Sequence, residues 1–153
     1  MVKIYKNQNT EPHLNRVLDF AKSKGLFVTR KITGASTKSF VLKHPSGHEL
    51  KIETDLANDF PLLYLQGKYI FGTDKPYSEK DWNWFEKNSK SIILAVLRDG
   101  YKEIQWYKGG KQSGGTAVIT DRGGKKIKLN DWSGPNFSLF DKKKTVNHPP
   151  LDS

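Results

Sequence analysis

The segment EIQWYKGGKQSGGTAVITDRGGKKIKL, residues 103–129, alternates short apolar runs with glycine-rich breaks. "TAVITD" and "KKIKL" each show the two-residue alternation of a half-buried strand, and Gly123–Gly124 between them is typical of a hairpin turn. "YKEIQWYK" (101–108) precedes them as another strand, and we expect "GGKQSGG" to be the loop that follows it. The segment therefore predicts an antiparallel meander.

The rest of the chain extends this pattern in both directions. "SIILAVL" (91–97) reads as a buried strand, and Asp99–Gly100 after it is a hairpin signal. Apolar residues at helical spacing and end signals predict helices at 11–24 and 79–89, the second opened by a capping box at 78–81. The remaining strands are expected at 26–32, 38–44, 48–54 and, as a strand-turn-strand pair, at 61–72.

These elements give the order α-βββ-ββ-α-ββββ, which predicts an α+β protein with antiparallel sheet(s) and two helices. On the second helix, Trp82 and Phe85 share the core side, and Trp84 is expected to be partly exposed. A chain of 153 residues is expected to form a single domain over 1–140. The lysine-rich end, 141–153, reads as a basic flexible tail.

Two segments of the chain also resemble each other in sequence. Residues 39–53 align without gaps on residues 116–130, at an offset of 77, with Gly47 matching Gly124 and Lys51 matching Lys128. Two explanations remain open: a duplicated helix-plus-meander unit, with copies at 11–55 and 78–131, or the general likeness of two hairpins with alternating apolar residues.

The charge composition indicates which class of partner the protein binds. The formal net charge is +10, with 26 Lys and Arg against 16 Asp and Glu, and the stretch 101–128 holds 7 basic and 2 acidic residues. An excess of this sign favours polyanions, nucleic acid first and an acidic protein second. The chain has no cysteine, which excludes disulfides and thiolate zinc sites. It shows neither a signal peptide nor a membrane span, so we expect a cytoplasmic protein.

The candidate binding site follows from strand alternation. We expect an outward sheet face that carries Tyr107, Lys126 and Lys128, flanked by a flexible loop with Lys108 and Lys111. Lysines beside the two related turns complete the predicted nucleic-acid-binding set: Lys43, Lys51 and Lys125. The alternative is an ordinary solvated face of a half-buried sheet. Binding would be mostly electrostatic and weakly sequence-specific, as in a small accessory protein of a phage or mobile element.

Two further functions stay open, and the sequence leaves undecided whether the protein is an enzyme. If it is one, it is a small ribonuclease or metal-dependent nuclease whose catalytic candidates are His44, His48 and Glu53. The other alternative is a basic inhibitor or adaptor that binds an acidic protein. Gly115 stands where a phosphate-binding loop needs its lysine. We therefore expect no cofactor, and no metal-binding spacing is present.

Overall fold

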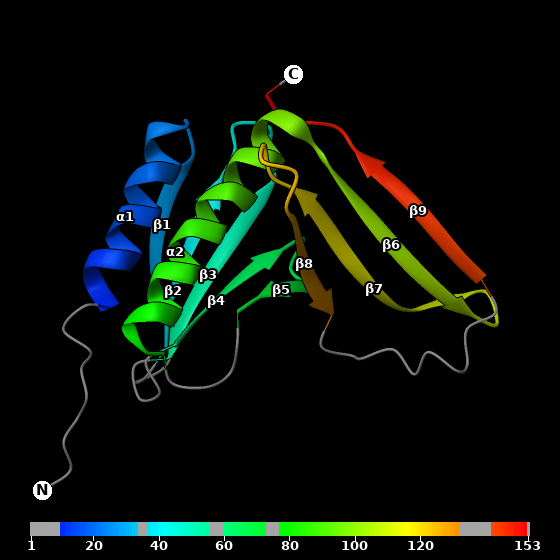
Figure 1. Cartoon of the computed structure of the whole chain (residues 1–153), viewed down its shortest axis with the longest axis horizontal. Helices are drawn as coiled ribbons and strands as arrows, with labels where there is room; N and C mark the ends of the chain where they lie inside the picture. Colours follow the sequence, from blue (N-terminus) through cyan, green and yellow to red (C-terminus); the bar gives the residue numbers. More distant parts are fainter. Residues whose placement is uncertain (1–9, 34–36, 56–59, 73–76, 132–141, 153) are drawn as a thin grey trace, which may run out of the picture. The chain divides into compact units, whose positions relative to one another are not determined.

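The computed structural model describes residues 10–33, 37–55, 60–72, 77–131 and 142–152. They form two α-helices, a π-helical segment and nine strands, and the strand pairs are antiparallel (Figure 1). The predicted α+β class and element order α-βββ-ββ-α-ββββ are confirmed, with a strand at 142–148 among the last four in place of the one predicted at 91–97. The chain divides into two compact units, Met1–Gly67 with Gly72–Lys90, and Lys68–Phe71 with Ser91–Ser153.

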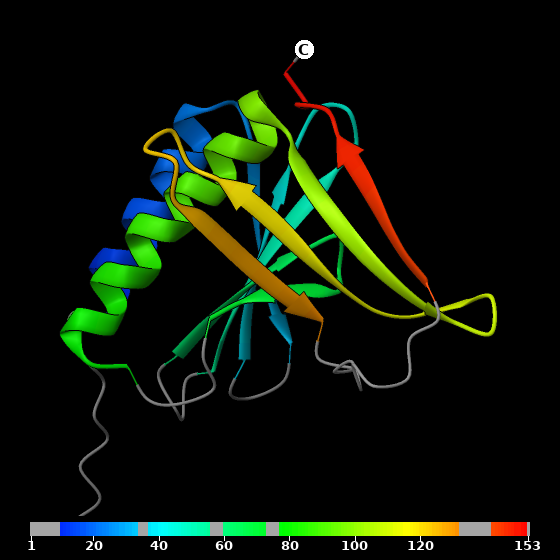
Figure 2. The same cartoon turned by 45° about the vertical axis from the view of Figure 1, so that its right-hand side comes forward.

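The first unit contains a four-stranded sheet in the order β1-β2-β3-β4. Its strands are β1 (Phe27–Thr33), β2 (Thr37–Lys43), β3 (Glu49–Asp55) and β4 (Phe60–Leu65). Helix α1 (Thr10–Ser23) and the part of α2 (Glu79–Leu94) up to Lys90 run side by side on one face of this sheet (Figures 1 and 2). The core of the unit includes Val17, Ala21, Leu42, Ile52, Leu63, Trp82 and Phe85, all fully buried.

The start of α2 and the end of α1 are formed by the residues that the sequence predicts. Ser78 and Asp81 form the capping box: the Asp81 amide donates to Ser78 Oγ, and the Ser78 amide donates to Asp81 Oδ2 over 2.9 Å. Gly25, with φ of 92°, closes α1. The Leu26 amide donates to the Ala21 carbonyl, and the Gly25 amide to that of Lys22, which is the Schellman pattern. Trp84 is 37% exposed, as expected.

The second unit contains a five-stranded sheet in the order β5-β8-β7-β6-β9. Its strands are β5 (Tyr69–Phe71), β6 (Tyr101–Lys108), β7 (Lys111–Thr120), β8 (Lys126–Asp131) and β9 (Lys142–His148). Figure 2 shows β8, β7, β6 and β9 as neighbours in that order. Its fully buried residues include Tyr69, Ile92, Ile93, Leu97, Ala117, Ile119 and Leu129.

The strand predicted at 91–97 is wrong. Helix α2 continues to Leu94 and passes into the π-helical segment η1 (Ala95–Asp99). A short run of apolar residues fits a buried helix as well as a buried strand, because neither leaves a polar face. Gly100, with φ of 76°, ends η1 and donates its amide hydrogen to the Ala95 carbonyl. Asp99–Gly100 is therefore a helix end, and the hairpin predicted there is absent.

The predicted flexible tail is also wrong for residues 142–152. Lys142–His148 form β9, which pairs with β6 along its whole length. Beyond β9, the Leu151 and Asp152 amides donate to the Val96 and Leu97 carbonyls, which a helix end leaves without intrahelical partners. A lysine-rich sequence suits such a position, because charged side chains protect an edge strand from further pairing.

The two hairpins that resemble each other in sequence have the same backbone register. Val41 pairs with Lys51 and Val118 pairs with Lys128. The turns match as well: the His44 and Asp121 amides donate to carbonyls four residues on, both over 2.8 Å. Each hairpin follows a helix and a strand, α1-β1 or α2-β6. Common descent by duplication of 11–55 and 78–131 remains a prediction.

Candidate functional site

The register of the second unit sorts the side chains of β6, β7, β8 and β9 onto two faces. Lys128 lies opposite Val118, and Val118 lies opposite Lys102, so these three side chains share one face. We call this the outer face. The other face carries the buried Ala117, Ile119, Ile127 and Leu129 and is called the inner face.

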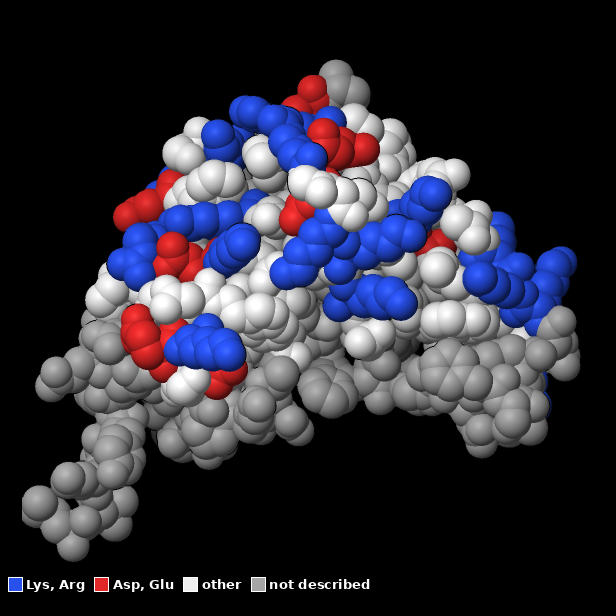
Figure 3. Space-filling model, viewed as in Figure 1, with Lys and Arg blue, Asp and Glu red and all other residues white. Residues whose placement is uncertain are grey.

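The outer face is strongly basic. Alternation and pairing place six exposed lysines on it: Lys102, Lys108, Lys111, Lys126, Lys128 and Lys143. Between them lie half-buried apolar side chains, Ile104, Trp106 and Val118. Within the described part of β6–β9, no acidic residue faces this side. Figure 3 shows lysine and arginine side chains gathered over β7 and β8, and again at the far end of β6 and β9.

The predicted sharing of one face by Tyr107, Lys126 and Lys128 is wrong. Tyr107 belongs to the inner-face side of β6, and its hydroxyl donates to Gln105 Oε1 over 2.6 Å. Trp106 is the aromatic residue on the lysine face. The reason is the cross-strand register, which sets the even residues of β6 beside the even residues of β8 and cannot be read from one strand alone.

The predicted flexible loop that carries Lys108 and Lys111 is a tight turn. The two lysines pair directly across Gly109 and Gly110, whose φ angles are 56° and 79°. Positive φ at both central residues is characteristic of a two-residue hairpin turn. The two lysines are thus held at the tip of a hairpin, on the side of Trp106.

The other predicted binding lysines do not form one group with these. Lys43 and Lys51 belong to the first unit. Lys51 forms an ion pair with Glu53 over 2.8 Å and lies over the ring of Tyr64. Lys125 is exposed in the β7–β8 turn, where its amide donates to Asp121 Oδ1. Lys43 is exposed at the end of β2.

The structure brings two of the three catalytic candidates together. His44 Nδ1 and His48 Nδ1 lie 2.7 and 3.0 Å from the same atom, Ser46 Oγ. Glu53 follows His48 by five residues in an extended strand, which places it about 16 Å along the chain. Its carboxylate is instead engaged by Lys51. Among the described residues, no group of three or more His, Cys, Asp or Glu is arranged to hold a metal ion.

A buried carboxylate, Glu103, lies on the inner face of β6 and is 3% exposed. It accepts hydrogen bonds from the Tyr69 hydroxyl and from His148 Nε2, the latter over 2.8 Å, and Lys68 Nζ lies 3.4 Å away. Burial on its own would raise the pKa of Glu103. The hydrogen bonds from Tyr69, His148 and Gln105 and the charge of Lys68 outweigh it and lower this pKa to about 2. Glu103 is therefore ionised.

A second charged cluster joins α1 to α2 in the first unit. The ring nitrogens of buried His13 lie 2.7 Å from Glu86 Oε1 and 2.9 Å from Glu79 Oε1. Burial would raise the pKa of Glu86, but hydrogen bonds from His13, Lys90 and Arg16 lower it to about 2. These charges neutralise one another, so the cluster connects the helices and leaves no net charge to attract an anion.

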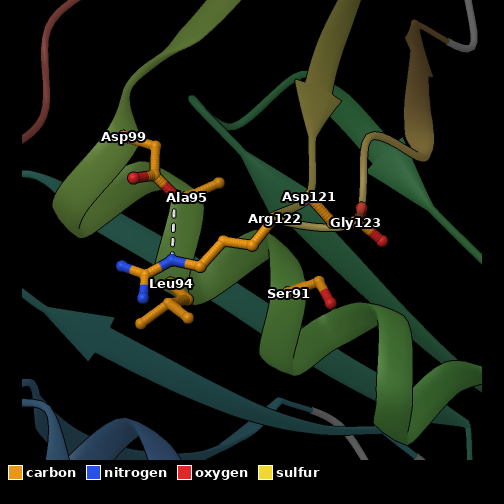
Figure 4. Close-up of a pocket in the computed structure, with 7 residues that line it drawn as sticks. All are labelled: Ser91, Leu94, Ala95, Asp99, Asp121, Arg122 and Gly123. Carbon is orange, nitrogen blue, oxygen red and sulfur yellow. Dashed lines mark ion pairs between the residues drawn. The ribbon is translucent and has the colours of Figure 1, made fainter.

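The β7–β8 turn closes over η1 around a hollow of about 230 Å³ (Figure 4). Arg122 extends from the turn across it, and its Nε lies 3.8 Å from Asp99 Oδ2. Because Asp99 already balances its charge, Arg122 contributes little to the basic outer face. An exposed pair of this kind stabilises a fold by at most about 1 kcal/mol.

Several residues of these clusters are missed by sequence reasoning. Lys102 and Lys143 carry no local signal, since strand pairing alone brings them onto the lysine face. Glu103 and His148 are 45 residues apart, and their pairing depends on β9, which reads as a tail. The sequence of β9, KKKTVNH, has one apolar residue and so lacks the alternation typical of a strand.

Comparison with protein-family models, with curated proteins and with solved structures gave no match to this chain. Neither helix of the described chain has the length and apolar character needed to cross a membrane.

Proposed function

We propose that the outer face of β6–β9 binds a nucleic-acid strand. The observation that carries the proposal is the six exposed lysines that share this face with Trp106, with no acidic side chain among them in the described strands. Lysines that neutralise phosphates supply affinity without sequence information, and an aromatic ring stacks on any base. The face thus suits binding that is mostly electrostatic and weakly sequence-specific.

The spacing of the lysines supports a linear polyanion. Lys126 and Lys128 are two residues apart on β8, which separates them by about 6.8 Å. Lys102 lies two strands further, about 10 Å across the sheet. The lysines of the β6–β7 turn and Lys143 continue the set to the other end of the same face. A nucleic-acid strand that lies across β8, β7 and β6 would contact Lys126 and Lys128 at one end of this path and Lys102 at the other.

The experiment is a salt-titrated binding assay with single- and double-stranded DNA and RNA, followed by a gel for cleavage. Replacing Lys126 and Lys128 by glutamine is expected to weaken binding and to reduce the salt slope by about 1.4–1.8. Its matched control replaces Lys22 and Lys80, two exposed helix lysines of the first unit, by glutamine. This control removes the same charge and should bind as the parent does.

Three outcomes would overturn the proposal. Equal loss in the two double variants would mean that net charge, and not the outer face, drives binding. Cleavage that depends on His48 would support the nuclease alternative. No binding at about 50 mM salt, where phosphate contacts are strongest, would direct attention to an acidic protein partner.

A further inference from the structure

The three lysines of β9 divide between the two faces of the sheet. Lys143 lies opposite Trp106 on the outer face, whereas Lys142 lies opposite Tyr107 and Lys144 opposite Gln105. Lys142 and Lys144 therefore belong to the inner-face side, beyond the buried core. There they line a hollow of about 390 Å³ together with Tyr107, Gly109 and Gly110. Pockets for small molecules span about 300–1,000 Å³, so this hollow is large enough for one.

The lining of this hollow combines basic and aromatic groups. Among the described residues, it offers two exposed ammonium groups, a half-buried phenol ring and the backbone of two glycines, and no acidic side chain. Open space lies beside both glycines where a larger residue would project. Ammonium groups bind phosphate as point charges, and a tyrosine ring stacks on a base.

The aromatic wall is held in place before any ligand arrives. Tyr107 donates its hydroxyl hydrogen to Gln105, and Gln105 in turn hydrogen-bonds the buried carboxylate of Glu103. This chain of hydrogen bonds fixes the ring beside Lys142 and Lys144. A pre-oriented ring loses less conformational freedom on binding than a mobile one.

We infer that this hollow binds a 5′-phosphorylated nucleotide, with the phosphate between Lys142 and Lys144 and the base on the ring of Tyr107. The nucleotide is either free or the 5′ end of a strand, because both present the same phosphate and base. The site lies on the opposite face from the lysines proposed to hold a nucleic-acid strand. A test of nucleotide binding in this hollow is therefore independent of the proposal that the outer face binds a nucleic-acid strand.

The test is a titration of the protein with AMP, inorganic phosphate and adenosine, followed by amide chemical shifts and calorimetry. AMP is expected to shift the amides of Tyr107, Gly109 and Gly110. Replacing both Lys142 and Lys144 by glutamine should weaken AMP binding by about tenfold or more, as expected for lost charge-assisted contacts. The matched control replaces Lys22 and Lys80, the same number of exposed charges in the first unit, and should leave AMP affinity unchanged.

A third variant separates the two parts of the ligand. Tyr107→Leu should weaken AMP binding and leave the weaker binding of inorganic phosphate unchanged. A 5′-phosphorylated oligonucleotide that binds through Lys142 and Lys144 more tightly than AMP would identify the strand end as ligand; the reverse order would identify the free nucleotide. Equal loss of AMP affinity in the two double variants, or AMP shifts confined to other residues, would overturn the inference.

Discussion

Tyr69 on β5 donates its hydroxyl hydrogen to the buried carboxylate of Glu103 on β6, although β8 and β7 lie between these strands. The tyrosine reaches across the sheet at Gly115 of β7. A Cβ atom at this position would overlap the Tyr69 hydroxyl and would approach the ring carbon Cε1 to 3.0 Å. This contact is possible because Gly115 has no side chain. It links β5 to β6 across the two strands between them.

Replacing Gly115 by alanine is expected to destabilise the protein by about 2–4 kcal/mol. The added methyl group must displace Tyr69 from a packed interior, and Glu103 then loses a hydrogen bond while it remains buried. The midpoint of urea unfolding measures the effect. Gly123→Ala is the control, because a Cβ there meets its nearest neighbour, Asp121, at an ordinary 3.4 Å. Equal midpoints for the two variants would refute the steric role of Gly115.

Acid is expected to destabilise the fold between about pH 4.5 and 2. The pKa values of Glu103 and Glu86 are both lowered from 4.5 to about 2. The unfolded chain therefore binds these protons first as the pH falls, so the stabilisation is fully present above pH 4.5 and is lost toward pH 2. Urea midpoints measured at pH 6, 4 and 3 should fall steadily. Glu103→Gln should show a shallower decline than the parent protein, and an unchanged slope would contradict the assignment.

The two neighbouring aromatic residues of β6 should behave differently in strand binding. Trp106→Ala is expected to weaken binding of a 5′-hydroxyl oligonucleotide by about 1–3 kcal/mol, the usual worth of one stacked base. Tyr107→Ala should leave it unchanged, because Tyr107 lies on the opposite face. Fluorescence anisotropy at fixed salt compares the two, with circular dichroism to verify folding. A larger effect of Tyr107 would exclude the outer face as the strand-binding surface.

The sequence predicts elements well where the signal is local. The capping box at Ser78 and the glycine end of α1 are satisfied by residues a few positions away, so both are readable without the fold. Prediction fails where the structure of a segment depends on its pairing with residues far away in the sequence. "SIILAVL" is apolar throughout, which suits helix and strand alike, and its helical end is completed by the Leu151 and Asp152 amides.

The candidate site shows the same limit. Alternation identifies the lysines of β8, since Ile127 and Leu129 between and beside them are buried. It puts the aromatic partner on the wrong face, because a shift of one residue in register exchanges Trp106 for Tyr107. The pairing of β9 with β6 decides which face of the sheet carries Lys142, Lys143 and Lys144, and the local sequence does not show this pairing.

The likeness of the two hairpins leads to a last prediction, on their turn glycines. Gly47 and Gly124 have φ angles of 99° and 84°, and a methyl group added at either would have no atom within 4 Å. Alanine at either site therefore meets no clash, and its cost is conformational only, about 1–2 kcal/mol. We expect Gly47→Ala and Gly124→Ala to lower the free energy of unfolding by the same amount within about 0.5 kcal/mol, in urea titrations monitored separately by amide signals of each unit. A large cost at one turn and none at the other would mean that the shared register hides different turn geometries, and would weaken the case that the two hairpins descend from one.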